Sequence, residues 1–258
     1  MTYSIVARDA VTGELGVAVQ THQPSVGALC PFAEPGVGAV ATQSIVEPAY
    51  GPLGITAMRD REAPADALQR LLAEDDGRDL RQVAFVDRNG DVAVHTGDRC
   101  IAHAGHVIGD GFSCQANMMR DPGVPEAMAA AFTTAAGDLA HRLLAALDAA
   151  QDAGGDIRGM QSAALIVVGP DGRLDRRVDD SPTPLVELRR LVDLDQDNPE
   201  GWFWAGVRLA FGGDVDAGRA SIEKAYRAND SWRELLRRLP PTGLVPDRPE
   251  VLERLLAP

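Results

Sequence analysis

The apolar positions in the first two thirds of the chain fall mainly into short runs separated by turn residues. Residues 2–8 and 15–20 are rich in Val, Ile and small side chains, with Thr12-Gly13 between them. Residues 82–86 and 92–96 flank Asn89-Gly90, a dipeptide that favours the tight turn of a β-hairpin. Both patterns are typical of antiparallel strand pairs. We expect further strands at residues 36–44, 106–108, 112–116, 162–168 and 173–178.

The intervening segments have helical spacing and come in pairs. One pair covers residues 50–58 and 63–73, and the other covers residues 125–134 and 138–151. Hairpins combined with paired helices favour an α+β fold, in which two antiparallel sheets are stacked and helices cover their outer faces. A parallel sheet with single crossover helices does not fit this order. We therefore expect one domain at residues 1–180, with residues 4–7 in a central strand.

The tail, residues 184–258, is helical throughout and follows the Pro-containing linker at residues 179–184. Residues 199–230 resemble a single tetratricopeptide-like unit, and we expect Trp202, Leu209 and Ile222 to share a small core. Because one such unit cannot bury its own face, the tail should cover the main domain or a second copy of the chain in a homodimer. A peptide-binding surface is the alternative.

Composition narrows the class of partner. The chain has 258 residues, of which 45% are hydrophobic, and a formal net charge of −13. This acidic balance argues against nucleic acid and anionic membranes as partners, because their phosphates would be repelled. No apolar run approaches the roughly 20 residues that span a bilayer, so we expect a cytoplasmic protein. Three widely spaced cysteines, Cys30, Cys100 and Cys114, fit reduced thiols better than a disulfide framework.

Thr2 is the first candidate for chemistry. It is small enough for Met1 to be removed during synthesis, which would leave a hydroxyl and a free α-amine on one residue. An amine can serve as the base that activates a weak hydroxyl nucleophile, and an α-amine titrates near pH ~8. Its position alone favours the simpler interpretation, that Thr2 merely begins a strand.

Several segments, in order, resemble an uncharacterised bacterial and archaeal family of the N-terminal nucleophile (Ntn) hydrolase superfamily. The resemblance covers about residues 1–180 and is carried by residues 2–9, 12–19, 36–43, 50–52, 81–83, 95–97, 111–112, 115–118 and 161–165. It implies a four-layer αββα sandwich. It also implies a nucleophile at the start of the first central strand, which is Thr2 here, with its amine as the base. It implies no particular substrate.

Such a site also needs donors for a tetrahedral oxyanion and groups that orient the amine. Gln43 and Ser44 end one predicted strand and Asn117 follows another, so we expect Gln43 and Asn117 to be catalytic and Ser44 to contact the substrate. Ser4 shares a strand face with Thr2, and His95 ends a strand, so both are further substrate-binding candidates. Capping of nearby backbone is the alternative role for each polar residue.

No cofactor or metal is expected. Cys100, His103 and His106 are spaced like ligands, but the spacing matches no standard zinc module, and residues three apart in a strand point to opposite faces. The glycine pairs at 36/38 and 109/111 lack the following helix of a phosphate loop.

Two functions of different class follow. The first is an amidohydrolase that acts through Thr2 on a small amide or related C–N bond of a small-molecule substrate. The second is a non-catalytic binding protein that keeps the same fold and engages a partner through its tail helices.

Overall fold

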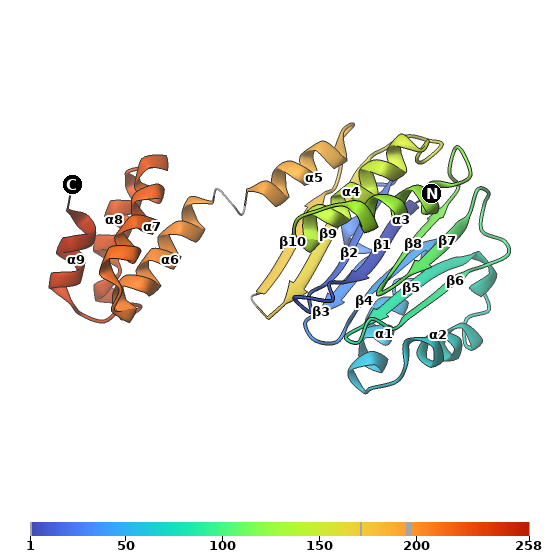
Figure 1. Cartoon of the computed structure of the whole chain (residues 1–258), viewed down its shortest axis with the longest axis horizontal. Helices are drawn as coiled ribbons and strands as arrows, with labels where there is room; N and C mark the ends of the chain where they lie inside the picture. The colour runs from blue at the N-terminus through green and yellow to red at the C-terminus, as the bar shows by residue number, and fades with distance from the viewer. Residues whose placement is uncertain (1, 171, 195–197, 258) are drawn as a thin grey trace. The chain divides into compact units, whose positions relative to one another are not determined.

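The computed structural model describes residues 2–170, 172–194 and 198–257 and has an α+β fold (Figure 1). The strands are β1 (Thr2–Arg8), β2 (Leu15–Thr21), β3 (Pro31–Glu34), β4 (Gly38–Ser44), β5 (Arg81–Asp87), β6 (Val92–Thr96), β7 (Gly105–Gly109), β8 (Phe112–Asn117), β9 (Ser162–Gly169) and β10 (Gly172–Val178). The helices are α1 (Tyr50–Arg59), α2 (Pro64–Ala73), α3 (Val124–Thr134), α4 (Leu139–Asp152), α5 (Pro184–Asp193), α6 (Pro199–Gly212), α7 (Val215–Ala228), α8 (Ser231–Arg238) and α9 (Pro249–Leu256).

The strands form two antiparallel sheets, as the hairpin signals predict. The six-stranded sheet has the order β10-β9-β2-β1-β8-β7, and the four-stranded sheet has the order β3-β4-β5-β6. The prediction that residues 4–7 lie in a central strand is confirmed, since β1 pairs with β2 on one side and with β8 on the other. Thr2 therefore lies opposite Thr21 on β2 and opposite Asn117 on β8.

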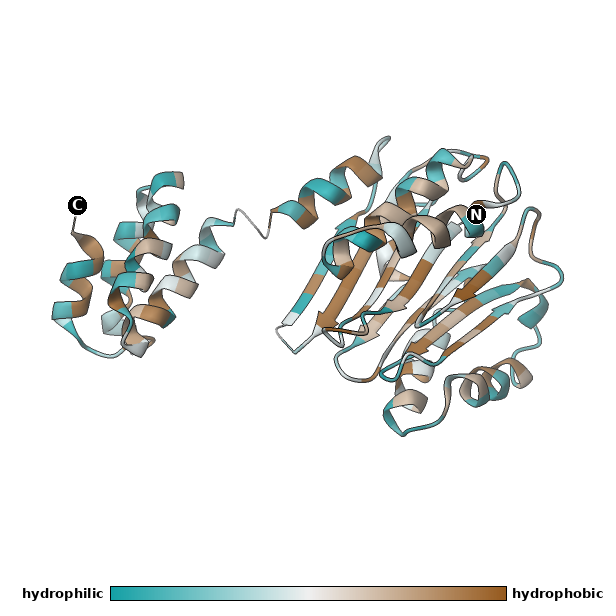
Figure 2. Cartoon of the chain, in the orientation of Figure 1, coloured by the Kyte–Doolittle hydropathy of each residue, from teal (hydrophilic) through white to brown (hydrophobic). Residues whose placement is uncertain are grey.

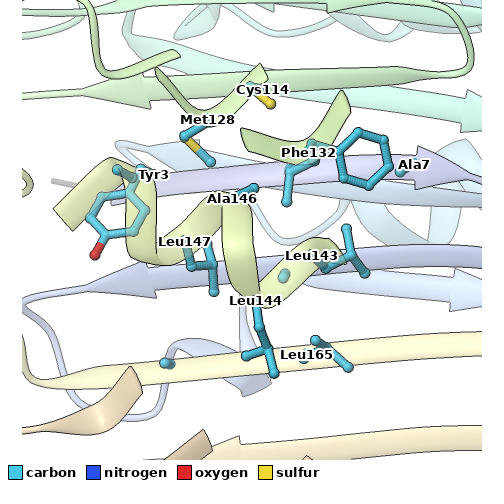
Figure 3. Close-up of a cluster of buried hydrophobic side chains, with 14 of the residues drawn as sticks. Tyr3, Ala7, Cys114, Met128, Phe132, Leu143, Leu144, Ala146, Leu147 and Leu165 are labelled. Carbon is cyan, nitrogen blue, oxygen red and sulfur yellow. The ribbon is translucent and has the colours of Figure 1, made fainter. Parts of the chain in front are cut away.

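Side chains of β1 alternate between two cores. Tyr3, Ile5 and Ala7 are buried beneath α3 and α4, where Leu143 and Leu147 contribute to the same cluster (Figure 3). Val6 points the other way, into a layer of small and branched side chains shared by the two sheets. This alternation follows from the two-residue period of a strand.

The outer face of the four-stranded sheet is covered by α1 and α2. Phe85 of β5 packs there with Tyr50 of α1 and Leu68 of α2. The layers thus run from α3 and α4 through the two sheets to α1 and α2, and apolar stretches mark the strands of both sheets (Figure 2). No helix within the described residues is long and apolar enough to cross a membrane.

The chain divides into two compact units, residues 1–192 and 193–258. Helix α5, expected in the tail, belongs to the first unit, because Leu185, Leu188 and Val192 are buried in the core beneath α3 and α4. The second unit has its own core, in which Ile222 is buried and Trp202 is partly buried. The expectation for Leu209 is wrong, since it is 43% exposed.

Candidate functional site

The layer between the two sheets changes from apolar to polar along its length. Val6, Val17, Val19 and Ile166 fill one part of it. Where β1 begins, the inward-facing residues are instead polar and almost completely buried: Thr2, Ser4, Thr21, Gln43, Gln82, Gln115 and Asn117. Burying so many polar groups costs free energy unless they are hydrogen-bonded, so this end is the candidate site.

Thr2 is held at its hydroxyl and at its backbone. Its Oγ1 donates to Thr21 Oγ1 at 3.1 Å. Its carbonyl oxygen accepts from Asn117 Nδ2 at 3.3 Å and from Gln43 Nε2 at 3.4 Å. Only 6% of Thr2 is exposed. The residue that would become N-terminal is therefore fixed by groups from both sheets.

Gln82 is the centre of this network and was not predicted. Its Oε1 accepts from Gln43 Nε2 at 2.7 Å and from Asn117 Nδ2 at 3.0 Å. Its Nε2 donates to Thr96 Oγ1 at 2.9 Å and to the carbonyl oxygens of Gly105 at 3.1 Å and Ala116 at 3.0 Å. With its oxygen engaged by two donors, Gln82 fixes the orientation of both neighbouring amides.

This geometry gives Gln43 and Asn117 a role other than the expected one. Their amide hydrogens point at Gln82 and at the Thr2 carbonyl, so they position Thr2 and are not free to receive an oxyanion. Asn117 Oδ1, by contrast, is buried without a hydrogen-bond partner. Of the three residues expected at the ends of strands as oxyanion donors, Gln43, Ser44 and Asn117, the two amides thus hold the Thr2 carbonyl oxygen instead.

Ser4 and His95 do not lie where substrate binding would require. Ser4 is fully buried behind Thr2, where its Oγ accepts from Gln115 Nε2 at 2.6 Å. On β6, Thr96 faces the other sheet, so strand alternation turns its neighbour His95 to the opposite face. There the His95 ring contacts the carbonyl oxygen of Arg78, with Nε2 at 2.8 Å.

A small pocket opens beside Thr2 between the sheets. It encloses about 30 Å³. Its buried floor includes Thr2, Thr21, Val26, Cys30, Thr42 and Gln43, and its more exposed mouth is formed by Gln23, Leu29, Ser44 and Val46. Ser44 is thus the predicted substrate contact that does line the pocket.

Three residues with left-handed backbone adjoin this pocket or its network. Ser44 has φ +74° directly after Gln43, Met118 has φ +60° directly after Asn117, and Ser25 has φ +58° directly before Val26. Residues other than glycine avoid this region, at a cost of order 1–3 kcal/mol each, and such residues gather at functional sites. Their position here is a second, independent indication of function.

The cysteine in the pocket is not a competing nucleophile. Burial raises the pKa of the Cys30 thiol to about 12, so it stays protonated at neutral pH. Its Sγ lies 3.9 Å from Gln43 Oε1, too far for more than a weak contact. Cys30 is therefore a weaker nucleophile candidate than Thr2. Within the described part of the chain, no three His, Cys, Asp or Glu side chains are grouped to hold a metal ion.

Comparisons with solved structures find two chains to report. The chain matches the crystal structure of protein SPO2555 from Silicibacter pomeroyi, which is described by the family model DUF1028, with a TM-score of 0.72 and 33% identity over 76% of this chain and 86% of that one. Anbu (ancestral beta-subunit) from Yersinia bercovieri matches with a TM-score of 0.35 and 11% identity over 73% of this chain and 91% of that one. That likeness is too distant to indicate a shared function.

The curated proteins contain no match to this chain. Nor does any match support a tetratricopeptide unit at residues 199–230, since the family model ends before them. That model covers residues 2–188, which is most of the first unit and includes every residue of the site described above. The chain therefore belongs to the family described as a family of unknown function, DUF1028.

Proposed function

We propose that the protein hydrolyses a small amide or a related C–N bond, with Thr2 as the nucleophile after Met1 has been removed. Met1 lies outside the described residues. The observation that carries the proposal is the setting of Thr2: the residue lies on the floor of a pocket, while buried amides hold its carbonyl oxygen. The order of helical and sheet layers is the one that the Ntn resemblance implies, which supports the same interpretation.

The reaction would proceed by acyl transfer. The Thr2 amine takes the proton of Oγ1, directly or through one water, and Oγ1 forms a bond to the acyl carbon. As the C–N bond breaks, the leaving amine takes that proton from the α-ammonium. Water then attacks the threonyl ester, releases the acid and restores the hydroxyl.

Residues at the mouth of the pocket beside Thr2 would stabilise the oxyanion. Ser44 and Gln23 line it and offer uncharged hydroxyl and amide donors. Neutral donors suit an oxyanion because they need not be matched by a buried counter-charge, and losing one such donor typically lowers the rate by ~10²–10³. Gln43 and Asn117 contribute by positioning Thr2.

The test begins with intact-mass measurement of the natively expressed chain, to establish whether Met1 is removed. A panel of small amides, ureas and acylated amines then supplies a turnover assay. Thr2→Ala should abolish turnover and Thr2→Ser should retain part of it, since hydroxyl and amine both remain. Thr133→Ala is the matched control, because Thr133 lies on the exposed side of α3.

Full turnover by Thr2→Ala, or by protein whose Met1 is intact by mass, would overturn the proposal. Activity should also rise with pH as the amine loses its proton near pH ~8. Absence of both turnover and an acyl adduct on Thr2 would instead favour the non-catalytic binding protein.

A further inference from the structure

We propose that a second cavity of the first unit binds a small organic anion, one that carries a carboxylate or phosphate group on an apolar body. The cavity encloses about 340 Å³ and is lined by residues of β3, α1 and β10. Arg59 of α1 and Arg173 and Arg177 of β10 contribute three guanidinium groups to it, and it is called the arginine cavity below. Binding there does not depend on the reaction proposed for Thr2.

The size and the apolar part of the arginine cavity suit a small molecule. Small-ligand sites are concave, largely apolar and typically about 300–1,000 Å³ in volume, with a few polar groups that fix orientation. Here Phe32 of β3 and Ile55 of α1 provide apolar surface. The Phe32 ring is closely packed, because an added Cβ on Gly51 would be 2.2 Å from it. A phenyl or short alkyl group would therefore find apolar contacts in the cavity.

The charge of the lining favours an anion. Three arginines line the cavity with one carboxylate, Glu34, which accepts hydrogen bonds from Arg59. Asp175 accepts from both Arg173 and Arg177. Positive charge thus gathers on this one cavity of a chain whose formal net charge is −13.

Two of the guanidinium groups keep a donor for a ligand. Arg59 binds Glu34, and Arg177 binds Asp175, each through Nε and Nη2, so Nη1 of each has no partner among the described residues. A guanidinium presents its N–H groups in a planar fork that fits carboxylate and phosphate oxygens. Because the ion pairs already hold these side chains in place, an anion that binds them pays less for ordering them.

The short 3-10 turn η1 (Val26–Ala28) separates the arginine cavity from the Thr2 pocket. Gly27 and Ala28 line the arginine cavity, whereas Val26 and Leu29 line the Thr2 pocket. The stem of Arg177 packs against this turn, since an added Cβ on Gly27 would be 2.8 Å from its Cδ. The two cavities are therefore distinct, and a change at Thr2 should leave anion binding as it is.

The test measures binding of phenylacetate and phenyl phosphate to the full chain by ligand-observed NMR titration, which is suited to weak binding. 2-Phenylethanol and 2-phenylethylamine are the neutral and cationic counterparts of phenylacetate. Acetate and inorganic phosphate present the two head groups without the apolar body. The ratio of the phenylacetate and phenyl phosphate dissociation constants shows which head group the cavity takes.

We expect at least one of the two phenyl anions to bind about tenfold or more tightly than 2-phenylethanol and than its own bare head group, and its binding should weaken as salt is added. Arg173→Gln and Arg177→Gln should each weaken that binding by about tenfold, since each removes a charged donor. Arg99→Gln is the matched control, because Arg99 is exposed and does not line the cavity.

Thr56 offers a test that removes no ion pair. It lines the arginine cavity on the exposed side of α1, and its side chain makes no hydrogen bond among the described residues. Thr56→Lys should tighten anion binding and Thr56→Glu should weaken it, each by about twofold to fivefold, as for an exposed charge pair. Thr133→Lys and Thr133→Glu, on the exposed side of α3, are the matched controls. The Thr56 pair decides the matter should an arginine variant unfold.

Phenyl anions that bind no more tightly than 2-phenylethanol, or anion binding that the arginine and Thr56 variants leave unchanged, would overturn the proposal. Loss of anion binding in Thr2→Ala would place the ligand at the Thr2 pocket and would overturn it too. Binding to Thr2→Ala as to the wild type, together with the opposite effects of the two Thr56 variants, would support a separate anion site.

Discussion

Asn117 and Thr2 face each other across the β1–β8 pair, and Asn117 Nδ2 donates to the Thr2 carbonyl oxygen at 3.3 Å. The same nitrogen donates to Gln82 on the other sheet at 3.0 Å. One side-chain amide thus ties the start of the central strand to the sheet stacked on it. The position of Thr2 therefore depends on how the two sheets are packed.

Replacing Asn117 by Asp should destabilise the first unit by about 1–3 kcal/mol or more, because the change removes both donated bonds and buries a carboxylate beside the Thr2 and Gln82 oxygens. Chemical denaturation measures the loss. Gln69→Glu makes the same amide-to-carboxylate change on the exposed side of α2 and should have little effect. Equal stability of the two variants would mean that the Asn117 bonds contribute nothing measurable.

The thiols should differ sharply in reactivity. Cys30 and Cys114 are buried, and burial raises the pKa of both, that of Cys30 to about 12. Cys100 is partly exposed. Iodoacetamide at neutral pH should therefore label the folded protein at Cys100, and all three cysteines should react in denaturant. Peptide mapping checks this, with Cys100→Ser as the control that abolishes labelling of the folded chain. Rapid labelling of Cys30 in folded protein would contradict the burial argument.

Lowering the pH should destabilise the segment beside Ser44, because protonation of Asp75 weakens its ion pair with Arg81. The hydrogen bonds that Arg81 donates lower the pKa of this carboxyl, and Arg81 also donates to the carbonyl oxygen of Ile45, next to Ser44. Because the folded pKa is below the unfolded value of about 3.9, the stabilisation is complete above that value and is lost as pH falls through the folded pKa.

Asp75→Asn should remove this part of the pH dependence and lower stability at neutral pH. Denaturation midpoints measured from neutral pH down to about pH 3 will show it. Asp98→Asn, at an exposed aspartate, serves as the control. If the Asp75→Asn and wild-type curves are parallel, the ion pair is not a source of acid sensitivity.

Truncation should distinguish the two possible positions of the domain boundary. A chain ending after residue 194 keeps α5 and should unfold at nearly the temperature of the first unit in the intact protein. A chain ending after residue 180 loses Leu185, Leu188 and Val192 from the core, and each buried side chain is worth about 1.5–3 kcal/mol. Calorimetry compares them, and equal stability of the two chains would show that α5 is dispensable.

Much of the fold could be predicted from sequence, because period and turn signals are local. The hairpin at Asn89-Gly90 and the helices before and after it formed as predicted. β3 was missed because it has only four residues and begins with a proline. The packing of α5 was missed for a different reason: an amphipathic pattern shows which face is buried but not which unit buries it.

The candidate site was only partly predictable. Thr2 can be found from its place beside the terminus. The inward face of β6 cannot be assigned from sequence, because both of its faces carry apolar residues. The prediction of His95 is therefore displaced by one residue from Thr96, which points inward. Gln82 and Gln115 were passed over as members of apolar strands. A polar residue inside an otherwise apolar strand was the signal available for both.

Alternation along β1 also governs how this chain can change. Thr2 and Ser4 serve the polar network, while Tyr3 and Ile5 serve the helix-covered core. Inserting or deleting one residue within 2–8 would exchange these faces. Polar side chains such as Ser4 would then enter the apolar core, and apolar ones such as Tyr3 would enter the polar layer between the sheets. The length of the first strand is therefore constrained as well as its composition. Insertions and deletions in homologues should fall instead at Gly13, where the backbone is left-handed and open to solvent.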